Sequence, residues 1–265
     1  MPRVSRTPKR GDAAPDPRAI LDPAVRAEPH AFFAALRASG PIHAVGDTGV
    51  HLVTRWAEIE EALGREADFS ANLTGVLVRK PDGAPGLFEL PSTGATDVIA
   101  TADEPAHAVH RALVQPQLAA AQVAALAPRM RAWARDALDD FLADGGGDFA
   151  REVAELVPAR TVLALLSIGD SHLRAIRQWA MMGGDMLAGD VGPERMAQLG
   201  AETARMSAFL QRHLERIATE PPRDGRQPSS LAHALARGVR RSEIDLAHAV
   251  GIAMVLVGAG GESTA

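Results

Sequence analysis

The stretch Ala259-Gly-Gly-Glu-Ser-Thr264 (AGGEST) lies near the end of this 265-residue sequence and follows a long apolar run. Consecutive glycines cost a helix about 1 kcal/mol each relative to alanine, but they let another group approach the backbone closely. Burying Glu262 is expensive unless the carboxylate is paired or has a chemical task. An acid followed by hydroxyls can relay protons to a reacting centre. From these residues alone, a proton relay and a helix end that frays into a glycine-rich loop both remain open.

The helix that carries this stretch is expected to begin at Ser242, because Ser242 and Asp245 match the spacing of a capping box. Its apolar run, 247–260, is shorter than the roughly 18 residues that a membrane span requires, so we expect a helix buried in protein. The helical pattern continues to Ala265 without a C-cap, a polar last turn or a proline. This pattern predicts that the sequence continues in a longer parent protein.

The rest of the sequence predicts a mainly α-helical protein with one early β-hairpin. Two short runs of mixed β-branched and polar residues, 42–45 and 50–54, flank a Gly-Asp-Thr-Gly turn and predict the hairpin. The segment 69–101 holds several prolines and glycines without sustained periodicity, so we expect a long loop. Apolar periodicity predicts helices elsewhere, at 29–39, 55–63, 119–143, 149–166, 170–187, 193–218 and 230–237.

Charge and composition restrict the class of protein. Asp and Glu (33) outnumber Lys and Arg (28), so the net charge of −5 does not favour nucleic-acid binding. The basic start of the chain predicts a flexible N-terminal arm over residues 1–20. That start lacks the apolar segment of a secretory signal, and the cytoplasm is the expected location, with no membrane attachment.

A second polar stretch, Asp103-Glu-Pro-Ala-His107-Ala-Val-His-Arg111, opens a predicted helix with Asp103 as its N-cap. His107 and Arg111 are four residues apart and therefore share a helix face. Their donors suit an anionic group, since an arginine can bind a carboxylate through two parallel hydrogen bonds. The alternative is an ordinary surface pair. A zinc site built from His107 and His110 lacks a clear third ligand.

These two stretches, in this order, resemble motifs of the cytochrome P450 family of the soluble bacterial type. The first resembles that family's Asp-x-Pro-x-His-x-x-x-Arg motif, and AGGEST resembles the small-Gly-x-acid-Thr motif of its oxygen-activating helix. The segments 53–63 and 157–168 also resemble parts of the family. The resemblance extends over nearly the whole chain from about Leu21 and implies an incomplete P450 domain over residues 21–265.

The resemblance implies a role for each motif residue. His107 and Arg111 would bind the propionates of haem (iron protoporphyrin IX), and Ala259 and Gly260 would flank the groove for dioxygen. Glu262 would be the acid of the proton-delivery pair. Ser263 takes the place of the usual threonine: it keeps the hydroxyl and lacks the methyl group that restricts the rotamer. The segments 69–101 and 176–196 resemble the family's variable pocket walls.

Two family features are missing from this sequence. The family binds iron through a cysteine thiolate, and this chain contains no cysteine. The family's Glu-x-x-Arg helix should follow the oxygen-activating helix, whereas the Glu202-Thr-Ala-Arg205 match precedes it and is expected to be a surface pair.

The implied function is that of an N-terminal fragment of a haem–thiolate monooxygenase, inactive alone. The enzyme would act on a small organic substrate with a ferredoxin-type electron donor. The alternative is a non-catalytic truncated or decayed helical protein that binds apolar ligands or partners. A helical transcriptional regulator is disfavoured by the acidic balance and by the lack of a basic recognition helix.

Overall fold

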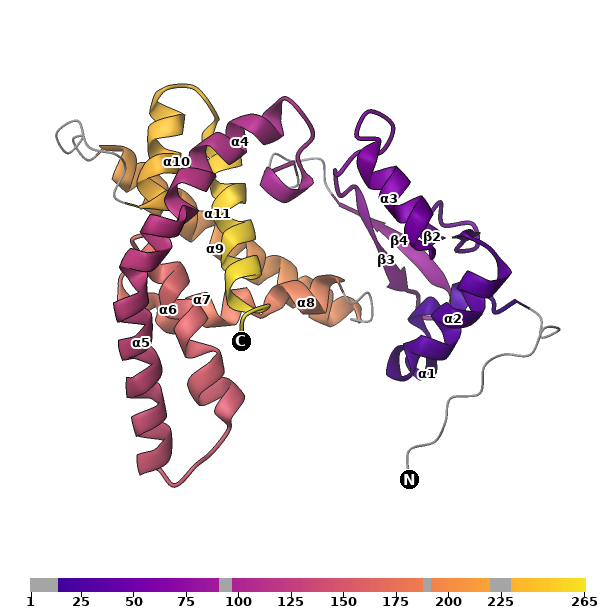
Figure 1. Ribbon diagram of the computed structural model, residues 1–265, viewed down its shortest axis with the longest axis horizontal. Coiled ribbons are helices and arrows are strands. Elements are labelled where there is room, and N and C mark those ends of the chain that lie inside the picture. Colours follow the sequence, from indigo (N-terminus) through magenta and orange to yellow (C-terminus); the bar gives the residue numbers. More distant parts are fainter. Residues whose placement is uncertain (1–13, 91–96, 188–191, 220–229) are drawn as a thin grey trace. The chain divides into compact units, whose positions relative to one another are not determined.

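The computed structural model describes residues 14–90, 97–187, 192–219 and 230–265 (Figure 1). The contacts of these residues divide them into an N-terminal unit up to Leu90 and a helical unit that contains the rest. Much of the expected basic arm, residues 1–13, lies outside the described residues.

The N-terminal unit begins with three short helices and a β-hairpin. The side chains of Asp16 and Asp22 cap the first two helices, by accepting hydrogen bonds from the backbone N–H groups of Arg18 and Ala24. The hairpin pairs Ile42 with Val53 and so confirms the predicted one. The elements are the 3-10 helix η1 (Pro17–Leu21), α1 (Pro23–Ala27), α2 (Pro29–Ser39), β1 (Ile42–Ala44), β2 (His51–Val53) and α3 (Trp56–Gly64).

A second antiparallel hairpin, β3 (Gly75–Arg79) with β4 (Pro85–Glu89), occupies much of the segment for which the sequence predicted a long loop. That prediction was wrong for these residues. The apolar run 76–78 favours a strand, and the turn is closed by Asp82, whose side chain accepts from Ala84 N–H, and by Gly83 at φ 85°. Prolines caused the error, although Pro85 stands at the first position of its strand, where proline is tolerated.

The helical unit confirms the prediction of a mainly α-helical protein. Other long helices appear close to the predicted bounds, but two predicted helices are divided. The helix predicted at 149–166 is a π-helical turn and an α-helix, and the one predicted at 170–187 is a 3-10 turn and two α-helices. The elements are η2 (Ile99–Thr101), α4 (Ala106–Val114), η3 (Gln115–Leu118), α5 (Ala120–Ala143), η4 (Ala150–Ala154), α6 (Leu156–Leu165), η5 (Asp170–His172), α7 (Leu173–Ala180), α8 (Met182–Leu187), α9 (Pro193–Thr219), α10 (Leu231–Arg240) and α11 (Leu246–Gly261).

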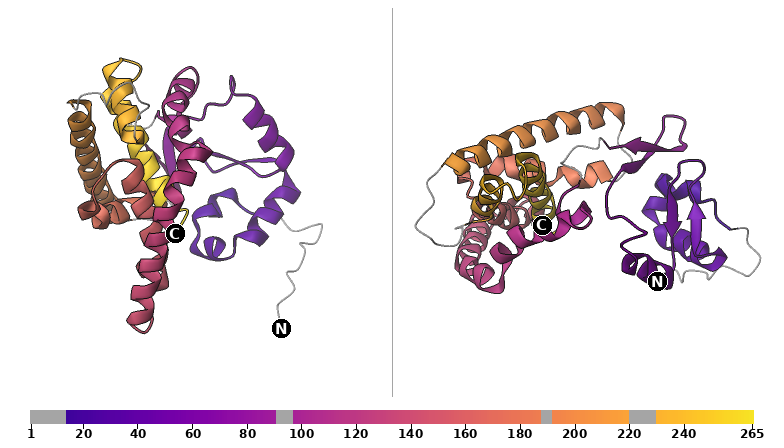
Figure 2. Two further views of the ribbon diagram at one scale, coloured as in Figure 1. Left: turned by 60° about the vertical axis from the view of Figure 1, so that its left-hand side comes forward. Right: turned by 90° about the horizontal axis from the view of Figure 1, so that it is seen from above.

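Helix α11 forms the centre of this unit and lies against α6, α7, α9 and α10 (Figure 2). Ile252, Ala253 and Val257 are fully buried in it, as are Leu163 on α6 and Leu210 on α9. The apolar run 247–260 is thus largely covered by protein, as its length predicted. Among the described residues, no helix combines the length and apolarity of a membrane span.

Two predicted helix starts were wrong. Helix α11 begins after Asp245, whose side chain caps it by accepting from His248 N–H at 2.8 Å. Ser242 instead has a left-handed φ of 57°, and its N–H binds Val239 O in the turn that ends α10. Helix α4 begins after Pro105, and its first turn is satisfied by Glu104, which accepts from Ala108 N–H at 3.0 Å. Spacing alone did not show that Asp245, and not Ser242, caps α11, or that Pro105, and not Asp103, occupies the N-cap position of α4.

Candidate functional site

His107 and Arg111 lie one turn apart on α4, on the side of that helix that reaches solvent. The Nδ1–H group of His107 donates to Glu104 Oε1 at 2.9 Å. Glu104 therefore fixes the ring and leaves Nε2 available for another group. The hydrogen bonds from His107 and Ala108 hold the pKa of the Glu104 carboxyl below its usual value. Sequence reasoning missed this role, although the i, i+3 spacing of Glu104 and His107 was visible.

The guanidinium of Arg111 is exposed, and within the described part of the chain no hydrogen bond or ion pair is recorded for it. It can offer donors to a carboxylate on the solvent side of α4, and His107 adds a donor from Nε2 when both of its ring nitrogens carry a proton. This pair has the chemistry that an anion-binding interpretation of the motif requires.

His110, the other histidine of the motif, is buried and has a structural role. Its ring is 2% exposed, and its Nδ1 accepts from Ile99 N–H at 3.2 Å. Burial, together with nearby His248, whose ring centroid is 5.5 Å away, lowers the pKa of His110 and favours the neutral ring. In the described ranges, no three His, Cys, Asp or Glu side chains gather where they could hold a metal ion.

The glycines of AGGEST let α11 approach two other helices. A Cβ at Gly260 would lie 3.1 Å from Val162 Cγ2 on α6, and a Cβ at Gly261 would overlap Ala180 Cβ on α7. Ala259 is exposed on another side of the helix. The glycines thus serve close packing, and the exposed Ala259 leaves one side of this last turn open.

Glu262 is held by the backbone of α8. Its Oε2 accepts from Gly184 N–H at 3.0 Å, and a Cβ at position 183 would lie 3.3 Å from the same oxygen. A Cβ at Gly184 would overlap the other carboxylate oxygen. Gly183 and Gly184 form a surface that receives this half-buried side chain. Sequence reasoning missed them; two glycines within a predicted helix were the available signal.

Ser263 has a different partner from its neighbour Glu262. Its hydroxyl donates to Ala259 O at 2.7 Å, a bond back to the preceding turn, and its side chain is exposed. Among the hydrogen bonds recorded for the described residues, none joins Glu262 to Ser263. The structure brings the two predicted catalytic residues to one helix end but does not connect them.

The two motifs lie near opposite ends of α11. Helix α4 approaches its start, where the rings of His110 and His248 are in contact. Glu262 lies at the opposite end, about 20 Å further along an axis that rises roughly 1.5 Å per residue. A single ligand that reached both would have to be large.

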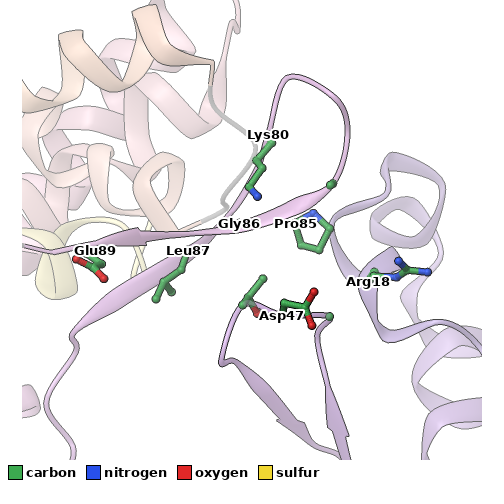
Figure 3. A pocket seen from close by; sticks show the side chains of 10 residues that line it. Arg18, Asp47, Lys80, Pro85, Gly86, Leu87 and Glu89 are labelled. Atoms are coloured by element: carbon green, nitrogen blue, oxygen red, sulfur yellow. The ribbon is translucent and has the colours of Figure 1, made fainter.

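The N-terminal unit contains a pocket of about 460 Å³ that the sequence did not indicate (Figure 3). Side chains of η1, the β1–β2 turn and the β3–β4 hairpin line it, and Arg18, Asp47, Lys80 and Glu89 give it both signs of charge. Arg18 is already paired with Asp16 at 2.6 Å. The mixed charge favours no particular class of ligand.

Comparisons with known proteins bear on these motifs. A scan against protein-family models gives no match. The chain is 32% identical over 240 residues to cytochrome P450 144 of Mycobacterium tuberculosis, covering 90% of this chain and 54% of the relative. It is 30% identical over 238 residues to a vitamin D(3) 25-hydroxylase of Pseudonocardia autotrophica, covering 89% of this chain and 55% of the relative. The chain thus spans about half the length of the curated relatives it matches.

A solved structure extends the comparison to the fold. The myxobacterial cytochrome P450 CYP267B1 matches with a TM-score of 0.66 at 20% identity, over 92% of this chain and 59% of that one. The matched helices and small sheets belong to the N-terminal part of the P450 fold. Relatives and fold agree with the motifs on α4 and α11, and the chain is therefore a partial cytochrome P450.

Proposed function

We propose that this chain forms part of a haem–thiolate monooxygenase. The reaction places one oxygen atom of O2 in a small organic substrate and reduces the other to water, with two electrons and two protons. The observation that carries the proposal is the 32% identity to a P450 over 90% of this chain. The His107–Arg111 pair on α4 and the Glu262–Ser263 pair after α11 support it, because they follow the order of the family's motifs.

The residues of this chain suit the propionates of haem, but they do not supply the thiolate ligand of its iron. Arg111 offers outward-facing donors, and His107, one turn away, adds one from Nε2 when both of its ring nitrogens carry a proton, which suits carboxylate groups such as the propionates. The sequence contains no cysteine, so the thiolate ligand is not supplied by these 265 residues. When bound, haem supplies the oxygen chemistry, while this chain binds its carboxylates and contributes part of the surroundings.

Glu262 and Ser263 are the proposed proton-handling groups. Each can exchange a proton through its side-chain oxygen, and both lie at the end of α11. For a relay, Glu262 must leave Gly184 N–H and Ser263 must turn from Ala259 O. We propose that the two side chains change partners in this way, beside the open side of the helix at Ala259.

The substrate and the redox partner are proposed at the level of chemical class. One relative is named for hydroxylation of vitamin D(3), and another, from Mycolicibacterium smegmatis, is named a steroid C26-monooxygenase. A mainly apolar organic substrate is consistent with these names. We propose a ferredoxin-type electron donor and a cytoplasmic location, without a nucleic-acid partner.

Haem binding provides the test. The 265-residue chain is titrated with haem and with haem dimethyl ester, in which both carboxylates are blocked, and absorbance is followed. We expect haem to bind more tightly than the ester, and His107→Gln and Arg111→Gln to reduce that preference. Arg131→Gln, at an exposed position on α5, is the matched control and should keep it. Equal binding of haem and ester by the unmodified chain would contradict the carboxylate role and favour a non-catalytic helical protein.

A second readout concerns the ligand of the iron. The ferrous–CO spectrum of the reconstituted chain should lack a thiolate-type band, because no cysteine is present. Observation of such a band from the pure chain would show that our account of the iron ligand is wrong.

A further inference from the structure

A pocket in the helical unit lies between α9 and the turn that follows α6, away from the motifs described above. We propose that it binds a small planar aromatic carboxylate. The pocket has a volume of about 290 Å³. Turn 167–169 forms one side, and the other lining side chains are His172, Phe209, Arg212, His213 and Arg216. Ligand pockets commonly begin at about 300 Å³, so this one suits a ligand with a single ring.

The positive charge of the pocket favours binding of an anion. Arg212 and Arg216 are i, i+4 neighbours on α9, and both line the pocket with guanidinium groups. Within the described part of the chain, no carboxylate side chain lines the pocket. Exposed Asp170 follows the turn but is not part of the lining. The chain as a whole is acidic, with a net charge of −5, so this concentration of cations is local. An anion bound there would be attracted by the guanidinium groups.

His213 orients one of the two arginines. Its Nε2–H donates to Leu166 O at 2.8 Å, which leaves Nδ1 as an acceptor, and Arg216 Nη2 donates to Nδ1 at 3.2 Å. Burial lowers the pKa of His213 and so favours the neutral ring that this arrangement requires. The guanidinium of Arg216 is thereby held at the pocket by a side chain that is itself anchored to the turn after α6.

An aromatic surface accompanies the two guanidinium groups. The Phe209 ring lies 4.7 Å from His172 between centroids, and it is nearly parallel to His213, at 6° and 6.2 Å. On another side it contacts Trp179 at 5.5 Å, which restricts its movement. A flat ring can stack in offset fashion on such a surface, while its carboxylate receives paired hydrogen bonds from an arginine. Together these features favour an aromatic carboxylate over a simple inorganic anion.

The pocket of the N-terminal unit is a weaker candidate despite its larger volume. Its cations, Arg18 and Lys80, share the lining with Asp47 and Glu89, and Arg18 is paired with Asp16. The pocket on α9 combines charges of one sign with an aromatic ring, and this combination specifies a class of ligand.

Benzoate binding to the 265-residue chain tests the proposal, by isothermal titration calorimetry or by NMR. We expect saturable binding of one benzoate per chain. Arg212→Gln and Arg216→Gln should each raise the dissociation constant about tenfold, since each removes a charge-assisted hydrogen bond. Arg205→Gln is the matched control, because Arg205 is also exposed on α9 but is paired with Glu202 outside the pocket. This control should leave the dissociation constant unchanged.

Two further measurements separate ring recognition from charge. Inorganic phosphate should bind at least tenfold more weakly than benzoate, and Arg212→Lys should weaken benzoate binding while keeping the charge. Thermal melting of each variant shows whether it is folded, and Arg212→Lys serves if Arg212→Gln is not. The proposal is overturned by absence of saturable benzoate binding, by phosphate that binds as tightly as benzoate, or by an equal loss in Arg205→Gln.

Discussion

The two ends of α11 are held in place by different means. At the start, Asp245 caps the helix and accepts from His248 Nδ1 at 2.7 Å, and His248 contacts the buried His110 of α4. At the other end, Gly260 and Gly261 lie against side chains of α6 and α7, and Glu262 binds a backbone N–H of α8. Polar side chains determine one end and close backbone approach determines the other. Substitutions should therefore affect the two ends in different ways.

Gly261→Ala should have the largest effect. The added Cβ would overlap Ala180 Cβ, which is short and cannot turn away, so α11 and α7 must separate. Overpacking of this kind costs about 1–3 kcal/mol, which exceeds the gain of roughly 1 kcal/mol from helix propensity. Urea denaturation followed by circular dichroism measures the loss. Gly258→Ala is the matched control, since no atom lies within 4 Å of its added Cβ, and it should stabilise the chain. Equal effects at the two positions would show that close approach is not the constraint.

Asp245→Ala tests the opposite end and should cost about 1 kcal/mol through loss of the N-cap. The same denaturation experiment applies, with Asp245→Asn as the control that keeps a capping oxygen. Ser242→Gly distinguishes the two possible starts of the helix. Because Ser242 has a left-handed φ of 57°, glycine should be tolerated or stabilising there. A large loss at Ser242 together with none at Asp245 would contradict the observed cap.

Acid should weaken the start of α11 through His110. Burial holds its pKa in the folded chain below the ordinary 6.5, so the unfolded chain binds more protons in that range. The stability it contributes is present above about pH 6.5 and is lost as the pH falls towards the folded-state pKa. His110→Asn should reduce the change in unfolding free energy between pH 7 and 5. This reduction should be smaller than the loss of about 1 kcal/mol expected for Asp245→Ala. His30→Asn on α2 is the exposed control. An unchanged pH profile in His110→Asn would rule out this contribution.

The same contrast explains how much of the molecule could be predicted from its sequence. Periodicity located α5 and the buried run of α11, because burial of one face repeats along a helix. The motifs identified His107, Arg111, Glu262 and Ser263, and their roles stay predictions. The hairpin at 75–89 was missed because its prolines outweighed a short apolar run. The bond between Glu262 and Gly184 joins residues 78 positions apart, and no local pattern encodes such a contact.

Of these substitutions, Gly184→Ala should change stability least, although its Cβ would also overlap an atom at the end of α11. That atom is Glu262 Oε1, the tip of a flexible side chain, which can swing away where Ala180 Cβ cannot. Alanine gains about 1 kcal/mol in helix propensity, and loss of the Gly184 N–H bond costs a similar amount, so the net change should stay within about 1 kcal/mol.

The Gly184→Ala substitution should change the position of the Glu262 carboxylate more than it changes the stability of the chain. The carboxyl carbon resonance of Glu262 in NMR should shift in Gly184→Ala and much less in Gly183→Ala, whose Cβ would lie 3.3 Å from Oε2. A loss as large as that of Gly261→Ala, with an unshifted resonance, would mean that α8 and α11 are packed rigidly. Glu262 would then be a structural anchor, unable to exchange Gly184 for a proton-transfer partner, and the proposed relay would lose its acid.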